Sequence, residues 1–383
     1  MSKSNFLRYF EIAFNTIKRY SFGINRDHNI KYLTYEMTNE CNSKCEMCNI
    51  WANKKNDKIL KTKEVIDFFN DRALRNLKEV ILTGGELFMR DDIPTIVESI
   101  WKINQKTIIT LSTNGILYEK ILSNAEDIAR QGIPVNYGIS LDGLGEDHNH
   151  RRRIENNFEI IDEKLIPGLK KLNNKFGNIS IGIGHCLDEY GSKTFEQVKD
   201  YCENKKISFM SQLIEDFDYY LPEKKQKKIS NQWEGIHFMK VGSDGKNRLL
   251  KKDIYSKNSV KYSEMISKLP TNIHHLRMIN FLSDRAPRYE CSSFRNFFLL
   301  KYDGAITPCL RFSTQELGNI KNESLSSILD KNDRKTAVDE ILKCEGCLNT
   351  WCTEWSMQEN IIPFKREAAR LIMHKFKKTF KLN

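Results

Sequence analysis

The sequence lacks any apolar run of the roughly 18 residues that a membrane-spanning helix needs. Its start, MSKSNFLRYF, lacks the apolar stretch and the small-residue cleavage site of a signal peptide. It contains no internal repeat, no low-complexity tract and no zinc-finger histidine pair. These absences exclude a secreted or membrane-spanning chain and predict a cytoplasmic protein.

The composition is that of a soluble globular protein. With 383 residues, 40% hydrophobic and 29% charged, the chain can bury a substantial core in two domains, or in one large domain with an appendage. The formal net charge of +11 favours anionic partners: phosphorylated or nucleotide-linked substrates, an acidic lipid surface or nucleic acid. The sign of the charge does not choose among these partners.

Short β-branched runs alternate with helical patterns over residues 30–213. The predicted strands are 31–37, 79–83, 107–112, 134–141, 178–185 and 207–213. The predicted helices lie around 62–71, 92–103, 117–131, 155–176 and 193–205. This order predicts right-handed βαβ units and an α/β fold with a parallel sheet, either a partial barrel or an open doubly wound sheet. Both architectures place their chemistry at the carboxyl ends of the strands.

The regular pattern ends after residue 213. Residues 214–290 are typical of an insertion or linker, and 291–360 predict a small α+β subdomain stapled by metal, with two strands around a glycine turn. Residues 1–29 hold an amphipathic helix and a connector, and 361–383 hold a basic amphipathic helix. We expect these helices to pack on the protein; contact with the anionic inner face of a membrane is the alternative.

Ten cysteines in a cytosolic chain indicate metal binding or catalysis, because that compartment keeps thiols reduced. The first group, Cys41, Cys45 and Cys48, follows the first predicted strand. A structural zinc site needs a fourth ligand, and the next residues offer neither Cys nor His. Three thiolates on a four-iron cluster instead leave one iron open to a small molecule.

The C-x3-C-x2-C spacing after a first strand resembles the radical S-adenosylmethionine (SAM) enzymes. Further segments of that family follow in order at later strand ends. They are Thr83-Gly84-Gly85-Glu86, Ser112-Thr113-Asn114-Gly115, and Ser140-Leu141-Asp142-Gly143 followed by His148 and Arg152. The resemblance covers residues 30–213 and implies a partial (β/α)6 barrel similar to a TIM barrel. Met47 departs from it, because the family usually has an aromatic residue there.

The resemblance also implies cofactor contacts. Its SAM-binding residues would be Gly84, Gly85, Glu86, Ser112, Asn114, Ser140 and Arg152. Bare backbone at the glycines would approach the SAM amino group, Glu86 would accept its hydrogen bond, and Ser140 with Arg152 would hold the methionine carboxylate. Taken one at a time, the Gly84-Gly85-Glu86 segment is also compatible with a simple turn, the segment from Ser112 to Gly115 with a generic loop, and Ser140 with a cap at a strand end. His148 is also compatible with a structural role.

The second cysteine group comprises Cys291, Cys309, Cys344, Cys347 and Cys352. Its spacing alone is compatible with a four-thiolate zinc site or with an iron–sulfur cluster. After a radical SAM barrel, it resembles the SPASM/twitch extension, whose full form uses about eight cysteines. Five cysteines imply one auxiliary 4Fe-4S cluster, with Cys291, Cys309, Cys344 and Cys347 as ligands and Cys352 as a spare thiol or an alternative ligand. Cys186 and Cys202 are expected in the core.

The family resemblance implies reductive cleavage of SAM to a 5′-deoxyadenosyl radical, which abstracts hydrogen from a substrate. The expected substrate is a small anionic metabolite such as a nucleotide- or lipid-linked sugar, and the expected electron donor is a flavodoxin or ferredoxin. Gln212, Glu215 and Asp216 are candidates for the substrate end of the barrel. The alternatives are a peptide or protein maturase and a non-enzymatic zinc-ribbon module that binds nucleic acid. No acid or base residue is assigned.

Overall fold

The computed structural model describes residues 30–52, 58–213, 239–241, 247–249, 291–310, 315–330 and 355–356. The chain forms two compact units, which we treat separately: the larger contains residues 28–236 and 294–337, and the smaller contains the rest. The predicted terminal helices and most of 214–290 lie outside the described residues, as do Glu215, Asp216, Cys344, Cys347 and Cys352.

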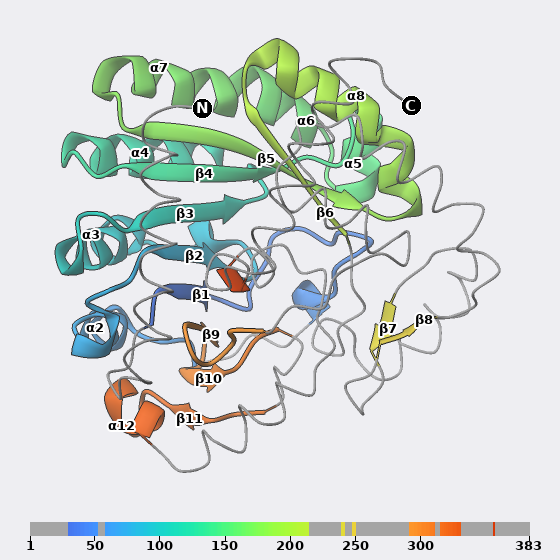
Figure 1. Cartoon of the computed structure of the whole chain (residues 1–383). Coiled ribbons are helices and arrows are strands. Elements are labelled where there is room, and N and C mark those ends of the chain that lie inside the picture. The colour runs from blue at the N-terminus through green and yellow to red at the C-terminus, as the bar shows by residue number, and fades with distance from the viewer. Residues whose placement is uncertain are drawn as a thin grey trace, which may run out of the picture. The chain divides into compact units, whose positions relative to one another are not determined.

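The larger unit is built on six parallel strands that neighbour one another in chain order (Figure 1). They are β1 (Tyr32–Glu36), β2 (Glu79–Thr83), β3 (Ile108–Thr113), β4 (Val135–Ser140), β5 (Ile179–Leu187) and β6 (Ser208–Leu213). Each predicted strand is present, with its ends shifted by no more than two residues. The α/β fold with a parallel sheet, as in a partial barrel, is therefore confirmed.

Helices connect the strands and cover one face of the sheet. They are α2 (Thr62–Phe69), α3 (Ile93–Ile103), α4 (Tyr118–Arg130), α5 (Glu146–Arg152), α6 (Asn157–Glu159), α7 (Ile166–Phe176) and α8 (Glu189–Lys205). The predicted helix 155–176 is interrupted by a π-helical segment, Ile160–Leu165. Helix α8 begins four residues before its predicted start, because the Asp188 carboxylate accepts a hydrogen bond from the Gly191 N–H and caps the helix.

The two faces of the sheet differ in composition. On β4, Val135, Tyr137 and Ile139 are buried, whereas the alternate residues, Asn136 among them, are only half-buried. Asn136 Nδ2 donates to Thr110 Oγ1 on β3 at 3.4 Å, so these polar side chains share one face. Apolar residues thus face the helices and polar residues line the other side, as the two-residue period of a strand requires.

Strands from the second half of the chain extend the same sheet. β9 (Phe297–Leu300) pairs in parallel with β1, and β10 (Ala305–Thr307) and β11 (Gly318–Asn319) follow in antiparallel order. Gly304 turns between β9 and β10 with φ of +92°, a conformation that favours glycine. The predicted pair of strands around a glycine is confirmed, and it is part of the larger unit.

The remaining described elements are short. 3-10 turns occur at Ile50–Ala52, Arg72–Leu74 and Leu87–Met89, and α12 (Leu325–Asp330) follows β11. In the smaller unit, β7 (Met239–Val241) pairs with β8 (Asn247–Leu249). There, the Ser292 N–H donates to Ser356 Oγ at 3.0 Å, and Trp355 is buried. Across the described ranges, no helix has the length and apolarity to cross a membrane.

Candidate functional site

The first three cysteines lie in one loop, residues 37–52, which we call the cysteine loop. It begins where β1 ends, and the Met37 N–H donates to the Thr83 carbonyl at the end of β2. The Cys48 N–H donates to the Cys45 carbonyl, and Trp51 Nε1 donates to the Cys48 carbonyl at 2.6 Å. The loop is therefore folded by its own hydrogen bonds at the carboxyl edge of the sheet.

The backbone of Gly84 and Gly85 packs directly against the backbone of the cysteine loop. The Gly85 N–H donates to the Thr38 carbonyl and the Glu86 N–H to the Glu40 carbonyl, both at 2.8 Å. A Cβ atom would lie 2.4 Å from the Thr38 oxygen at Gly84 and 1.9 Å from the Glu40 oxygen at Gly85. Because the two backbones touch, no larger side chain fits at either glycine. The contact that these glycines make in the structure is with the cysteine loop.

The three thiols are chemically suited to a metal cluster. Cys45 is buried, and Cys41 and Cys48 are partly exposed. Burial raises the pKa of Cys41 to about 12 and that of Cys48 to about 11, although backbone N–H groups of Ser43 and Ile50 bond to these sulfurs and oppose the shift. Thiols buried in this way become thiolates when a cation compensates the charge. Within the described ranges, no group of three or more Cys, His, Asp or Glu residues is arranged to hold a single metal ion.

Glu86 and the loop after β3 support the cysteine loop from the side. Glu86 is 1% exposed; its Oε1 accepts from Phe88 N–H and Thr113 Oγ1, and its Oε2 accepts from Asn114 N–H at 2.8 Å. Burial raises the pKa of Glu86 to about 7 against the opposing effect of these donors. Asn114 Nδ2 donates to Asn42 Oδ1 at 2.8 Å, which ties the loop after β3 to the cysteine loop. We propose this supporting role for Glu86 and Asn114.

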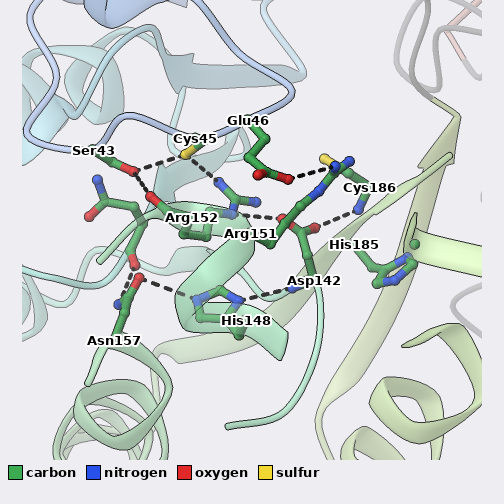
Figure 2. Close-up of polar contacts among 12 residues, drawn as sticks. Ser43, Cys45, Glu46, Asp142, His148, Arg151, Arg152, Asn157, His185 and Cys186 are labelled. Atoms are coloured by element: carbon green, nitrogen blue, oxygen red, sulfur yellow. Dashed lines mark hydrogen bonds and ion pairs between the residues drawn. The ribbon is translucent and has the colours of Figure 1, made fainter. Parts of the chain in front are cut away.

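Asp142, just after β4, is the centre of a buried polar network (Figure 2). Its Oδ1 accepts from the Cys186 N–H at 2.8 Å and its Oδ2 from Arg152 Nε at 2.7 Å. Burial alone would raise its pKa, but Arg152 and the histidines lower the pKa of Asp142 to about 2. The carboxylate is therefore charged at neutral pH, and it fixes Arg152 by a charge-assisted hydrogen bond.

Arg152 joins this network to the cysteine loop. Its Nη1 lies 3.8 Å from Cys45 Sγ, and its carbonyl accepts from Ser43 Oγ at 3.0 Å (Figure 2). Burial opposes its charge, but Asp142 and Cys45 raise the pKa of Arg152 above its usual value. A guanidinium has five N–H groups, so Arg152 keeps donors for a ligand carboxylate, the role that the sequence predicts. Ser140, its predicted partner, is half-buried at the end of β4.

The role of Arg151 could not be predicted from the sequence. It is 1% exposed and forms an ion pair with the buried Asp188, and its Nη1 lies 3.6 Å from Glu46 Oε2. Its carbonyl accepts from the Glu46 N–H, and its guanidinium lies over the Tyr190 ring. Arg153, by contrast, is 54% exposed. Helix α5 thus holds the middle of the cysteine loop through Arg151, and the run of three arginines was its one signal in the sequence.

His148 has a structural role. Its Nδ1 accepts from the Asp142 N–H at 3.1 Å and its Nε2 faces Asn157 Oδ1 at 3.2 Å. Nδ1 must be unprotonated to accept, so the ring is neutral with its proton on Nε2. Burial, together with the charge of Arg152, lowers the pKa of His148 to about 4.

The pKa of His148 predicts acid sensitivity of the metal-free protein. An unfolded histidine titrates near 6.5, so the unfolded state binds more protons between pH 6.5 and 4. The stabilisation from neutral His148 is present above about pH 6.5 and is lost as the pH falls towards about 4, by as much as about 3 kcal/mol. Urea unfolding of the wild type and of His148→Asn at pH 7 and 4.5 measures this loss of stability. The wild type should lose more stability than the variant; equal losses would contradict the assignment.

The remaining candidate residues lie on several different elements of the two units. Ser112 on β3 and Gln212 on β6 are half-buried, and the Cys186 N–H donates to Asp142. Cys202 is fully buried in α8, as predicted. In the smaller unit, the Cys291 sulfur accepts from the Ser293 N–H at 3.5 Å and lies 3.9 Å from Ser356 Oγ. Cys309 follows β10 in the larger unit and is half-buried.

Comparison with known families and proteins gives independent matches. Residues 35–203 match the radical SAM superfamily, and residues 291–349 match SPASM, an iron–sulfur cluster-binding domain. A GTP 3′,8-cyclase of Helicobacter pylori strain HPAG1 is 27% identical over 202 residues, which are 49% of this chain and only 61% of that protein's length. A probable GTP 3′,8-cyclase of Methanococcus aeolicus is 26% identical over 289 residues, which are 73% of this chain and 85% of that protein.

Solved structures share the fold. A histidine-tagged form of anSMEcpe with bound AdoMet gives a TM-score of 0.56 at 17% identity, over 92% of this chain and 98% of that one. Streptococcus suis SuiB bound to the precursor peptide SuiA gives 0.53 at 15% identity, over 81% of this chain and 67% of that one. At these identities the likeness is one of architecture. It agrees with the parallel sheet and helices described above.

Proposed function

Because this chain belongs to the radical SAM superfamily and carries a C-terminal SPASM iron–sulfur cluster-binding domain, we propose that it abstracts hydrogen from a small anionic metabolite. When bound, a 4Fe-4S cluster with SAM supplies the 5′-deoxyadenosyl radical for this reaction. The chain's own residues hold, orient and shield these groups. Membership of an enzyme superfamily decides against the zinc-ribbon alternative.

One observation carries the assignment of the cofactor site. The loop with the three thiols packs its backbone against Gly84 and Gly85, and its Cys45 sulfur lies 3.8 Å from Arg152 Nη1. We assign Cys41, Cys45 and Cys48 as cluster ligands. The donor set fits, since soft thiolates are the ligands of iron–sulfur clusters and three of them leave one iron open. Arg152, with Ser140, would hold the methionine carboxylate, and Asp142 keeps the guanidinium in place.

The substrate class rests on charge and on the sequence relatives. The net charge of +11 attracts anions, and the two cyclases described above are named for a nucleotide, GTP. A nucleotide-linked or lipid-linked sugar agrees with both observations. A peptide is the second candidate, because anSMEcpe and SuiB were solved with peptides bound. We propose a flavodoxin- or ferredoxin-type protein as electron donor. Contact of the amphipathic chain ends with an anionic membrane is the alternative to their packing on the protein.

We propose one auxiliary 4Fe-4S cluster, held by Cys291, Cys309, Cys344 and Cys347, with Cys352 as a spare thiol or an alternative ligand. Four thiolates saturate a cluster, which suits it to electron transfer rather than to substrate binding. Such a cluster can accept the electron left when a substrate radical is oxidised. The reaction would then be a net two-electron oxidation.

A single preparation tests both proposals. Anaerobically reconstituted wild-type protein should hold about eight irons per chain, in two four-iron clusters. After reduction with dithionite it should convert SAM to 5′-deoxyadenosine, and GTP, a nucleotide sugar, a lipid-linked sugar and a peptide are then compared. The substrate is the compound whose deuterated form transfers deuterium into 5′-deoxyadenosine. Tetrahedral zinc at the three thiols, or failure to cleave SAM, would contradict the function, and about four or twelve irons would contradict the single auxiliary cluster.

A further inference from the structure

Ser43 faces two of the three cysteine sulfurs. Its backbone N–H bonds to the Cys41 sulfur, and its Oγ lies 2.9 Å from Cys45 Sγ. The side chain is 1% exposed, so water does not compete for these contacts. In the sequence, Ser43 stands between the two cysteines with no special pattern. The fold places its hydroxyl against the Cys45 sulfur (Figure 2).

The Cys45 sulfur differs from the other two in its surroundings. It faces a hydroxyl from Ser43 and a guanidinium N–H from Arg152, at 2.9 and 3.8 Å. The contacts of the Cys41 and Cys48 sulfurs within the described residues are with backbone N–H groups of Ser43 and Ile50. Side-chain donors are therefore concentrated on one of the three thiols.

The single proton of the Ser43 hydroxyl has two acceptors within reach. One is the Arg152 carbonyl at 3.0 Å and the other is the Cys45 sulfur. A ligating Cys45 is a thiolate, which only accepts, and a charged acceptor forms the stronger hydrogen bond. The proton should therefore turn to the sulfur once a cluster is bound.

Hydrogen bonds to ligand sulfurs help to set the reduction potential of an iron–sulfur cluster. Reduction adds negative charge to the cluster, and a donor aimed at a sulfur stabilises that charge, more strongly in a buried, low-dielectric site. On the basis of the proposed function, we propose that Ser43 is a positioning residue that orients Cys45 and raises the potential of the SAM-binding cluster. The serine hydroxyl thereby makes the reduced state easier to reach.

Three substitutions test the proposal. Ser43→Ala removes the hydroxyl and keeps the backbone N–H, Ser43→Thr keeps a hydroxyl, and Ser99→Ala removes another buried hydroxyl, which bonds to the Ile96 carbonyl in α3. An electron paramagnetic resonance redox titration follows the cluster signal that changes on adding SAM. At a fixed potential, Ser43→Ala should lower the ratio of reduced to oxidised cluster by roughly 3- to 10-fold, where tenfold corresponds to 59 mV for one electron. Ser43→Thr should restore the ratio, and Ser99→Ala should leave it unchanged.

The outcomes separate this inference from the proposed function. If the wild-type protein cleaves SAM and Ser43→Ala titrates like the wild type, the role of Ser43 is refuted and the function stands. If the wild type binds no cluster at the three thiols, the function itself fails. Cluster loss in Ser43→Ala with retention in Ser43→Thr supports the positioning role. Cluster loss in both variants overturns it, because threonine keeps the hydroxyl.

Discussion

Cys45→Ala should reduce the formation of 5′-deoxyadenosine by at least about 1,000-fold, because two thiolates do not retain a cluster with one open iron. Cys45 is buried, and its sulfur lies between Ser43 Oγ and Arg152 Nη1. Iron should fall from about eight to about four per chain, since the auxiliary cluster remains. Liquid chromatography of 5′-deoxyadenosine and iron analysis measure the two effects.

Cys202→Ala is the matched control for this experiment. Cys202 is also a buried thiol, but it lies in α8 among core side chains. Its loss should cost about 1 kcal/mol of packing and leave both iron content and SAM cleavage near the wild-type values. SAM cleavage by Cys45→Ala at a rate within tenfold of the wild type would refute the assignment of the three ligands.

Gly85→Ala should abolish cluster binding at the cysteine loop, although it adds a single methyl group. The new Cβ would lie 1.9 Å from the Glu40 oxygen and 2.5 Å from the Glu40 carbonyl carbon. Backbone atoms cannot rotate away as a flexible side chain can, so the peptide bond that joins Glu40 to Cys41 must move. We expect SAM cleavage to fall at least about 100-fold, because small displacements of positioning groups are this costly.

Gly132→Ala controls for the general cost of replacing a glycine. Gly132 has φ of +74°, but a Cβ there would meet no atom within 4 Å. The change should cost about 1 kcal/mol of stability through backbone strain and leave the cluster in place. Iron analysis and urea unfolding of both variants make the comparison. If the Gly85→Ala protein bound as much iron as the wild type and cleaved SAM at the wild-type rate, the close contact between Gly85 and the cysteine loop would not be required.

The six strands could be predicted because apolar runs alternate with helical patterns along the chain, and several of these runs, such as EVILT in β2 and IITLST in β3, are rich in β-branched residues. The β-branched run EVILT predicts a strand at 79–83, and the structure has β2 at these residues. The cysteine spacing and the strand-end segments then located the site. Their family assignment is confirmed by the matches over 35–203 and 291–349.

Side-chain partnerships could not be predicted in the same way, because they depend on contacts between distant segments. The contact of Glu86 with the SAM amino group stays a prediction, whereas its hydrogen bonds from Phe88, Thr113 and Asn114 could not be foreseen from the sequence. Helix α5, with the sequence EDHNHRR, has no apolar stripe from which a helix could be recognised. Its role depends on Arg151 and Asp188, which are 37 residues apart in the chain.

The pairing of β9 with β1 has a consequence for biosynthesis. The strand that leads into the cysteine loop is flanked on one side by β2 and on the other by residues 297–300, which a ribosome makes some 260 residues later. Phe298 packs against Phe68 of α2, and Ser326 donates to Asp71 just after α2, so residues 297–326 also contact this helix and the turn that follows it. Until it arrives, β1 has an unpaired edge of the kind that promotes aggregation in nascent chains. Iron loading is therefore expected to follow chain completion rather than to accompany synthesis.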